Sequence, residues 1–385
     1  MQKNIFSDQK FRGILYQTLV VGLFAIGIYF VVTNTAYNLE KRNIATGFSF
    51  LNNPAGFDIS FSPFLDFKST DTHLKVYFVG VLNTLLVSIT GCIAATILGF
   101  IVGIIRLSSN WLLSRVAYVY VEFTRNVPLL LQIILWYAIL IQLPRIKQAI
   151  KFFDNFYIAN RGLFGPRPIF EEGFQVVFYT IILAIIVAFF IRRWAKKRQD
   201  QTGKQFPTFS FNAALIIFVP LIIFFIVGSP MSFEYPVLKG FNFKGGMVIR
   251  PEFIAMFLAL TIYTAAFISE TVRSGILSVT KGQREASGAL GLKKNWIMRL
   301  IILPQALRVI VPPLTSQYLN LTKNSSLGIA VGYADLVHGF GGISLNQTGQ
   351  AIECMAITMA TYLTISLTIS LFMNIYNRSI QFKEK

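Results

Sequence analysis

Residues 282–304 read Gly282-Gln-Arg-Glu-Ala-Ser-Gly-Ala-Leu-Gly-Leu-Lys-Lys-Asn-Trp-Ile-Met-Arg-Leu-Ile-Ile-Leu-Pro304, a charged stretch rich in small residues between two long apolar stretches. A short helix that starts near Lys281 would place Glu285 in its first or second turn, where the helix dipole favours a carboxylate. The small side chains that follow would let another protein approach closely, and they are Ala286, Ser287, Gly288 and Ala289.

The second half of this stretch predicts a return to the membrane. Gly291 is suited to end the short helix in a left-handed conformation. Residues 292–303 are then expected to lead back to the apolar stretch, and Pro304 to end the pattern. The result would be a helix-turn-helix along the membrane surface, suited to sit in a groove of a soluble partner. The alternative is an ordinary amphipathic loop.

The composition indicates a polytopic membrane protein. Hydrophobic residues make up 54% of the 385 residues and charged residues only 14%, and the apolar residues fall in runs of 17 or more. Such runs exceed the needs of a soluble core. The formal net charge of +18 does not indicate nucleic-acid binding, because basic residues beside apolar spans mostly set topology.

Catalytic and metal chemistry find little support in the sequence. Cys92 and Cys354 lie within apolar runs and are expected to be packing residues rather than a disulfide or metal pair. Only two histidines occur, His73 and His338, so we expect no metal site. The chain has no Gly-x-x-x-x-Gly-Lys-Ser/Thr loop, so any ATP that drives it would bind another subunit.

Hydropathy predicts an all-α fold with eight spans, since each apolar stretch approaches the roughly 20 residues that a bilayer requires. The first follows Lys3, Lys10 and Arg12 and is expected to be a retained helix rather than a cleavable signal. The expected helices are Ile14–Val32, Tyr77–Ile105, Val116–Leu143, Phe174–Ile191, Phe211–Gly228, Glu252–Ser269, Val309–Gly332 and Ala351–Tyr376.

Basic residues predict the orientation. With the N-terminus in the cytoplasm, the inner segments hold 21 Lys and Arg residues, and the outer segments hold 12 over a longer combined length. Because basic residues accumulate on the cytoplasmic side, we expect both termini and Glu285 there. The cluster at residues 192–198 is expected to anchor the chain on anionic lipid, with specific lipid regulation as the alternative. The outer segments Thr33–Val76 and Pro144–Gly173 are expected to be irregular, and they offer a docking surface.

The central stretch resembles the EAA loop of bacterial ABC importer membrane subunits. The matching positions are Glu285, Ala286, Ser287, Gly291, Ile301, Leu303 and Pro304. Ser287 stands where the motif usually has a second Ala, and it is equally small. The resemblance implies that these residues and Gly288 form a coupling helix and its return. It also implies that this chain is a permease rather than an enzyme, with no cofactor of its own, and that separate ATPase subunits hold ATP and Mg.

Flanking segments extend the likeness to polar amino acid importers. They are Gly80–Leu85, Val121–Pro128, Tyr263–Glu270, Leu303–Arg308, Asn320–Leu327 and Gly332–Leu336. The extra first helix, the segment Pro54–Asp58 and two inserted helices at about 174–228 further resemble the general L-amino acid permeases. This likeness implies a bacterial inner-membrane protein that pairs with a distinct second permease subunit, an ATPase dimer and a periplasmic amino acid binding protein.

The expected organisation follows from this resemblance. Residues 1–76 would form an N-terminal helix and periplasmic segment, and residues 77–385 a type I importer domain with a coupling loop at 270–308. Helices two, three, six, seven and eight would form its five-helix core.

Polar side chains inside the spans are candidates for a substrate path, because charges there are costly. Lys323 is the clearest, beside Asn324, Ser325 and Ser326 in the seventh span. It either attracts a substrate carboxylate or pairs with a carbonyl or carboxylate to hold the fold. Asn83 and Thr84 in the second span, and Glu353 near the end of the eighth, either line the path or bond across helices.

Glu122 and Arg125 stand one turn apart in the third span and are expected to pair. The pair is either a gate or a structural contact.

The leading interpretation is therefore an ATP-driven importer of L-amino acids. An ion- or proton-coupled secondary transporter is the alternative, but it would need a carboxylate deep in a span, and the sequence offers none. A membrane-bound sensory subunit is a third class.

Overall fold

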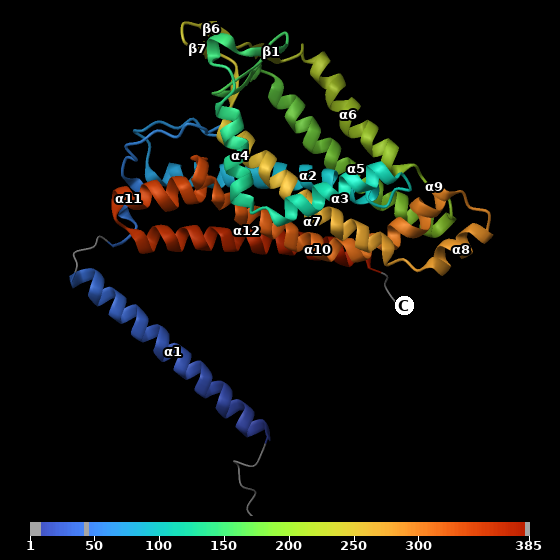
Figure 1. The fold of residues 1–385 in the computed structure, drawn as a ribbon, viewed down its shortest axis with the longest axis horizontal. Helices are drawn as coiled ribbons and strands as arrows, with labels where there is room; N and C mark the ends of the chain where they lie inside the picture. Colours follow the sequence, from blue (N-terminus) through green and yellow to red (C-terminus); the bar gives the residue numbers. More distant parts are fainter. Residues whose placement is uncertain (1–8, 42–45, 382–385) are drawn as a thin grey trace, which may run out of the picture. The chain divides into compact units, whose positions relative to one another are not determined.

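The computed structural model describes residues 9–41 and 46–381, and its long elements are helices (Figure 1). Seven of the described helices are long and apolar enough to cross a membrane, and one bent pair brings the total to eight. The expected helical membrane architecture is confirmed, although Lys3 lies outside the described residues. The long helices are α1 (Gln9–Lys41), α2 (His73–Ile105), α3 (Trp111–Asn126), α4 (Leu129–Ile141), α5 (Phe174–Thr202), α6 (Thr208–Ile226), α7 (Pro251–Leu277), α10 (Leu303–Asn324) and α12 (Ala351–Ile380).

The third expected helix is not continuous. Helices α3 and α4 meet at an angle of 106°. Pro128 has no backbone N–H and disfavours helical backbone in the residue before it, and Val127 is accordingly extended, with φ −92° and ψ 125°. The Gln132 Nε2 donates to the carbonyl oxygens of Thr124 and Val127, both at 3.0 Å. The prediction of one helix over Val116–Leu143 was therefore wrong, because a proline corner divides it.

The seventh expected helix changes character along its length. Helix α10 starts earlier than expected, at Leu303, and ends at Asn324, and a 3-10 helix continues over Ser325–Val331. Gly332, with φ +75°, ends this helix in the left-handed region that glycine adopts without strain. A π-helical stretch over Leu336–Ser344 and the short helix α11 (Leu345–Thr348) then lead to α12.

The chain divides into two compact units. The main unit contains the described residues up to Tyr137 and from Ala255 onward, and the inserted unit contains residues 138–254. Within the inserted unit, α5 and α6 lie side by side as an antiparallel hairpin (Figure 1). The expected boundary at residue 76 stays a prediction.

The segments outside α5 and α6 in the inserted unit form antiparallel strands. The expectation that Pro144–Gly173 is irregular was wrong, because its strands pair partly with residues that follow α6. One sheet has the order β1 (Ile150–Phe153), β2 (Phe156–Ala159), β3 (Gly162–Gly165) and β8 (Met247–Ile249). Two ribbons pair β4 (Arg167–Phe170) with β5 (Met231–Glu234), and β6 (Val237–Lys239) with β7 (Asn242–Lys244).

Glycine allows the closest approach in this sheet. Gly162 has φ +123°, and a Cβ there would lie 2.1 Å from the carbonyl oxygen of Ile249. Only a residue without a side chain fits that position. Beneath the sheet, Phe164 packs against Phe243 with ring centroids 4.7 Å apart.

Small residues bring α2 close to its neighbours in the main unit. Gly91, Ala95, Gly99 and Gly103 recur at every fourth position, which places them on one face of the helix. A Cβ at Gly99 would lie 2.6 Å from Ile268 Cγ2 of α7, and one at Gly103 would lie 2.8 Å from the Ser269 carbonyl oxygen. Helix α2 therefore packs its backbone directly against α7, as small-residue interfaces of membrane helices do.

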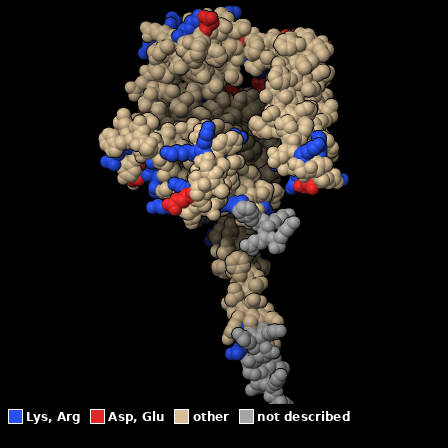
Figure 2. Space-filling model, turned by 90° about the vertical axis from the view of Figure 1, so that its right-hand side faces the viewer, with Lys and Arg blue, Asp and Glu red and all other residues tan. Residues whose placement is uncertain are grey.

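Large apolar side chains cover much of the chain's surface. Ile89, Ile93, Ile97 and Ile101 form a second row on α2, and each is at least half exposed. On the face seen in Figure 2, charged side chains gather in separate groups, and the surface between them is uncharged. Such a surface suits contact with lipid or with another membrane subunit.

Candidate functional site

The sequence predicted a short helix at Lys281, and the structure has α8 over Lys281–Ala289. Glu285, Ala286, Gly288 and Ala289 are exposed, whereas Ser287 is buried and its hydroxyl donates to the Gln283 carbonyl oxygen. The expected surface of small residues therefore forms without Ser287, which faces inward.

Backbone hydrogen bonds end α8 in a Schellman motif. The Leu292 N–H donates to the Ser287 carbonyl at 3.3 Å, and the Gly291 N–H donates to the Gly288 carbonyl at 2.9 Å. Gly291 has φ +73°, as expected of a glycine that ends a helix. The geometry fixes the direction in which the chain leaves α8.

Two contacts connect α8 and its surroundings to the spans. Arg284 Nη2 donates to the Ile276 carbonyl oxygen of α7 at 3.0 Å. A Cβ at Gly275 of α7 would lie 2.4 Å from Ile310 Cγ1 of α10. The helix before α8 and the helix after it therefore pack closely, and a displacement of α8 would act on both.

The return from α8 differs from the expectation at one position. The chain passes through α9 (Lys294–Trp296) and a π-helical stretch over Ile297–Ile302 into α10. Ile301 and Leu303 are half-buried, and Pro304 is exposed as the second residue of α10. Pro304 thus begins a helix instead of ending the pattern, because the first turn needs no N–H from it.

A cluster of charges joins α2 and α7 near the helix ends that lead to α3 and α8. Arg106, the C-cap of α2, forms an ion pair with Glu270 of α7, and Arg273 Nη2 lies 2.7 Å from the Glu270 Oε1. The Arg106 side chain is only 7% exposed. The Arg106 and Arg115 guanidinium groups lie 5.7 Å and 5.2 Å from the Tyr118 ring centroid. No local sequence pattern indicates this cluster, because its members are far apart in the chain.

The expected pair of Glu122 and Arg125 is wrong. Among the residues that the structure describes, no ion pair joins them. The Arg125 guanidinium lies instead over the Phe267 ring of α7, 5.2 Å from its centroid. The Arg125 side chain thus makes a cation–π contact with a neighbouring helix and no ion pair with Glu122.

The seventh-span candidates separate into exposed and inward-facing residues. Lys323, one residue before the end of α10, is exposed and has no carboxylate partner among the described residues. Asn324 is half-buried. Ser325 is buried, and its hydroxyl donates to the Thr322 carbonyl at 2.8 Å. Ser326 donates to the Lys323 carbonyl at 2.7 Å.

Asn83 and Thr84 are buried and bind the segment that follows Gly332. The Asn83 Nδ2 donates to the carbonyl oxygens of Phe61 and Ala334, both at 2.8 Å, and the Thr84 hydroxyl accepts from the Leu336 N–H at 3.1 Å. These bonds hold a loop against α2. Glu353 likewise accepts from the Gly47 N–H at 2.6 Å, so its contact is with the segment that precedes α2 and not with another span.

A buried carboxylate completes this polar cluster. Asp335 accepts from the His338 N–H at 2.8 Å and from the Tyr362 hydroxyl at 3.2 Å. It lies outside the spans, and burial raises its pKa to about 6. The Tyr333 hydroxyl donates to the Asn83 carbonyl at 2.7 Å. No local pattern predicts these contacts beyond the motif that contains Asp335.

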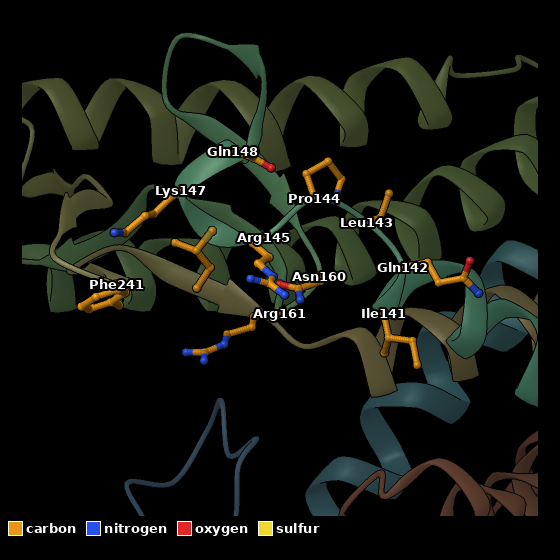
Figure 3. A pocket seen from close by; sticks show the side chains of 11 residues that line it. Ile141, Gln142, Leu143, Pro144, Arg145, Lys147, Gln148, Asn160, Arg161 and Phe241 are labelled. Atoms are coloured by element: carbon orange, nitrogen blue, oxygen red, sulfur yellow. The ribbon is translucent and has the colours of Figure 1, made fainter.

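A basic pocket of about 930 Å³ lies in the inserted unit. Figure 3 shows Arg145, Lys147 and Arg161 around it, together with the amides of Gln142, Gln148 and Asn160. Its lining contains no carboxylate, and Lys147 Nζ lies 4.1 Å from the Phe241 ring centroid. Such a lining suits a carboxylate or phosphate group.

A metal site needs several ligand side chains close together. In residues 9–41 and 46–381, no group of three or more His, Cys, Asp and Glu side chains could hold an ion. Cys92 is half-buried and Cys354 is buried, and both are free thiols. The Nδ1 of His73 lies 2.9 Å from the Ser344 hydroxyl, in a buried contact that holds the end of α2.

Comparison with known proteins identifies the family to which this chain is similar. The model of the binding-protein-dependent transport system inner membrane component matches residues 181–382. The matched range contains α8, its Schellman end and α10.

Three relatives align over nearly the whole chain. The general L-amino acid transport system permease protein AapQ of Rhizobium johnstonii is 48% identical over 379 residues, 98% of this chain and 94% of its own. The putative amino-acid ABC transporter permease protein YhdX of Escherichia coli is 47% identical over 382 residues, 99% and 97%. The glutamate/glutamine/aspartate/asparagine transport system permease protein BztB of Rhodobacter capsulatus is 46% identical over 410 residues, 98% and 96%.

Proposed function

Because the chain belongs to the family of binding-protein-dependent transport system inner membrane components, we propose that it is the permease subunit that imports L-amino acids in an ATP-driven ABC importer. The substrate class rests on the relatives, whose names specify amino acids. A periplasmic binding protein would deliver the substrate, and separate ATPase subunits would hold ATP and Mg. The protein would lie in the bacterial inner membrane, with both termini and α8 in the cytoplasm.

The observation that carries the coupling role is the form of α8. The exposed residues of its second half are Glu285 and three small residues, and a Cβ built at Gly288 would have no atom from outside its own helix backbone within 4 Å. An open surface of this kind suits insertion into a groove of an ATPase. Its hydrogen bond to α7, together with the close packing of α7 against α10, would turn closure of the ATPases into a rigid movement of the spans.

The exposure of Lys323 favours a substrate path that is formed together with a second subunit. An exposed cation in a span would face hydrocarbon unless water or protein covers it. We place Lys323 and Asn324 at a path shared with a second, similar but distinct permease subunit. Asn83, Thr84 and Ser325 would hold the surrounding frame, since their side chains bond inside the chain.

Amino acid uptake into membrane vesicles tests the proposal. The vesicles hold this chain with its ATPase, second permease subunit and binding protein, and ATP and the proton gradient are varied separately. A Cβ at Gly288 meets open space, so Gly288→Trp should project into the docking surface, and we expect ATP-driven uptake to be lost while membrane insertion is normal. Gly27→Trp is the control, because Gly27 of α1 is equally open and lies outside the motif.

A second pair of variants tests the end of α8. Alanine at position 291 costs about 1–2 kcal/mol in a left-handed conformation, whereas Asn tolerates it better. We therefore expect Gly291→Ala to lower uptake several-fold and Gly291→Asn to stay near the native rate. Uptake that ignores ATP, follows the proton gradient and survives Gly288→Trp would overturn the proposal in favour of a secondary transporter.

A further inference from the structure

A groove in the inserted unit runs between α5 and α6, close to the turn that joins them. Gly203, with φ +69°, ends α5, and its N–H donates to the Gln199 carbonyl at 2.9 Å. The groove has a volume of about 690 Å³. Its lining combines Arg192, Lys196, Gln199, Thr208 and Asn212 with the apolar residues Ala195, Phe206, Phe209, Ala213 and Ile216.

The basic residues of α5 separate into two groups. Arg193 lies over the Phe189 ring at 4.5 Å from its centroid, and Arg198 lies over the Trp194 ring at 5.3 Å. Arg192 and Lys196 stand one turn apart and both line the groove. Neither forms an ion pair with any described residue. The groove therefore presents two positive charges without a carboxylate to balance them.

The groove lies where the apolar part of α5 ends. Residues 174–191 are almost entirely apolar, and the basic cluster begins directly after them. Phe209, 87% exposed, and Trp194, 52% exposed, flank this level. Exposed aromatic side chains of this kind mark the boundary between hydrocarbon and headgroups. A molecule in the groove would have polar partners at one end and hydrocarbon at the other.

We propose that this groove binds one anionic phospholipid. Its phosphate lies between Arg192 and Lys196, the Thr208 hydroxyl and the Gln199 amide contact the headgroup, and an acyl chain runs along Ala213 and Ile216. Basic pockets between membrane helices favour anionic headgroups for this electrostatic reason. The proposal does not rest on amino acid transport, since all residues of the groove belong to α5, α6 and the turn between them, and none belongs to α8.

Binding of fluorescent phosphatidylglycerol to the purified full complex in detergent tests this site. Detergent removes the surface potential of a bilayer, so general attraction of basic residues contributes little. Arg192→Gln/Lys196→Gln should weaken binding at least about tenfold, since each substitution removes a charge-assisted hydrogen bond to the phosphate. Arg193→Gln/Lys197→Gln is the matched control, because it removes the same charge from the same helix without a direct contact to the phosphate, and it should weaken binding less than about threefold.

A variant without charge change keeps the test decisive if the glutamine variant does not assemble. Ala213→Trp fills the apolar end of the groove and should also weaken phosphatidylglycerol binding. Equal weakening by both glutamine variants, or by neither, would overturn the proposal. So would equal binding of phosphatidylcholine, or competition by inorganic phosphate at matched concentration, since that result would identify a phosphate site with no need for a lipid.

Discussion

Replacing Glu270 with Gln removes the carboxylate that joins α2 to α7. Among the described residues, Glu270 is the one carboxylate paired with Arg106. The Arg106 side chain is 7% exposed, whereas those of Glu270 and Arg273 are 29% and 34% exposed. The variant would leave a nearly buried guanidinium group without its counter-charge, while Arg273 could turn to water.

These exposures set the expected magnitude. Breaking a fully buried ion pair costs about 3–5 kcal/mol, and an exposed pair contributes about 0.2–1 kcal/mol. Because water reaches Glu270 in part, we expect Glu270→Gln to lower the free energy of unfolding by about 2 kcal/mol. The coupling energy with Arg106 should be about 1–2 kcal/mol, and that with Arg273 about 0.5 kcal/mol.

Two double-mutant cycles measure these coupling energies. They combine Glu270→Gln with Arg106→Gln and with Arg273→Gln, and free energies of unfolding come from reversible denaturant titrations in mixed micelles. Arg273 is the internal control, because it pairs with the same carboxylate from a more exposed position. The reasoning is refuted if the Arg273 cycle gives a coupling energy equal to or larger than that of the Arg106 cycle.

Three further variants follow from contacts in the main unit, each measured by unfolding in mixed micelles. Gly103→Ala places a Cβ 2.8 Å from the Ser269 carbonyl oxygen, so we expect a loss of about 1–3 kcal/mol, against less than about 0.5 kcal/mol for the exposed control Ile101→Val. Gln132→Leu leaves the Thr124 and Val127 carbonyls without their donor and should cost about 1–3 kcal/mol. The pKa of Asp335 is raised to about 6, so the folded state favours its protonated form. This stabilisation is full below about pH 4 and is lost as the pH rises through 6, a difference of about 3 kcal/mol in the free energy of unfolding. The free energy of unfolding of the native chain minus that of Asp335→Asn should fall over this range, and a flat difference contradicts the assignment.

Local patterns made the spans and α8 predictable. Apolar stretches of sufficient length identify spans wherever they occur, and Gly291 identifies the end of α8 because few other residues adopt its conformation. The corner at Pro128 also had a local sign, since a residue before proline avoids helical backbone. Hydropathy does not reveal this corner, because Val127 and Pro128 leave the stretch long and apolar enough to be predicted as one helix.

The remaining features depend on partners far away in the sequence. Glu270 pairs with Arg106, 164 residues away in the chain, and Asn83 binds Ala334, 251 residues away. Strand β3, which precedes α5 in the chain, pairs with β8, which follows α6. Strands of three or four residues are too short for alternation to reveal them. Arg125 has Glu122 one helical turn away as a local partner, but its side chain contacts the distant Phe267 ring on α7 instead.

The two rows of α2 have a consequence for sequence divergence. At Gly99 and Gly103, any side chain would clash with backbone carbonyls or β-branched side chains of α7. Substitution there therefore requires a compensating change in α7. At Ile93 and Ile97 the side chains are exposed, and any apolar residue of similar length would serve. A complete substitution library of this helix should therefore show intolerant and tolerant positions alternating with the helical repeat, and the intolerant row would tend to change only together with α7.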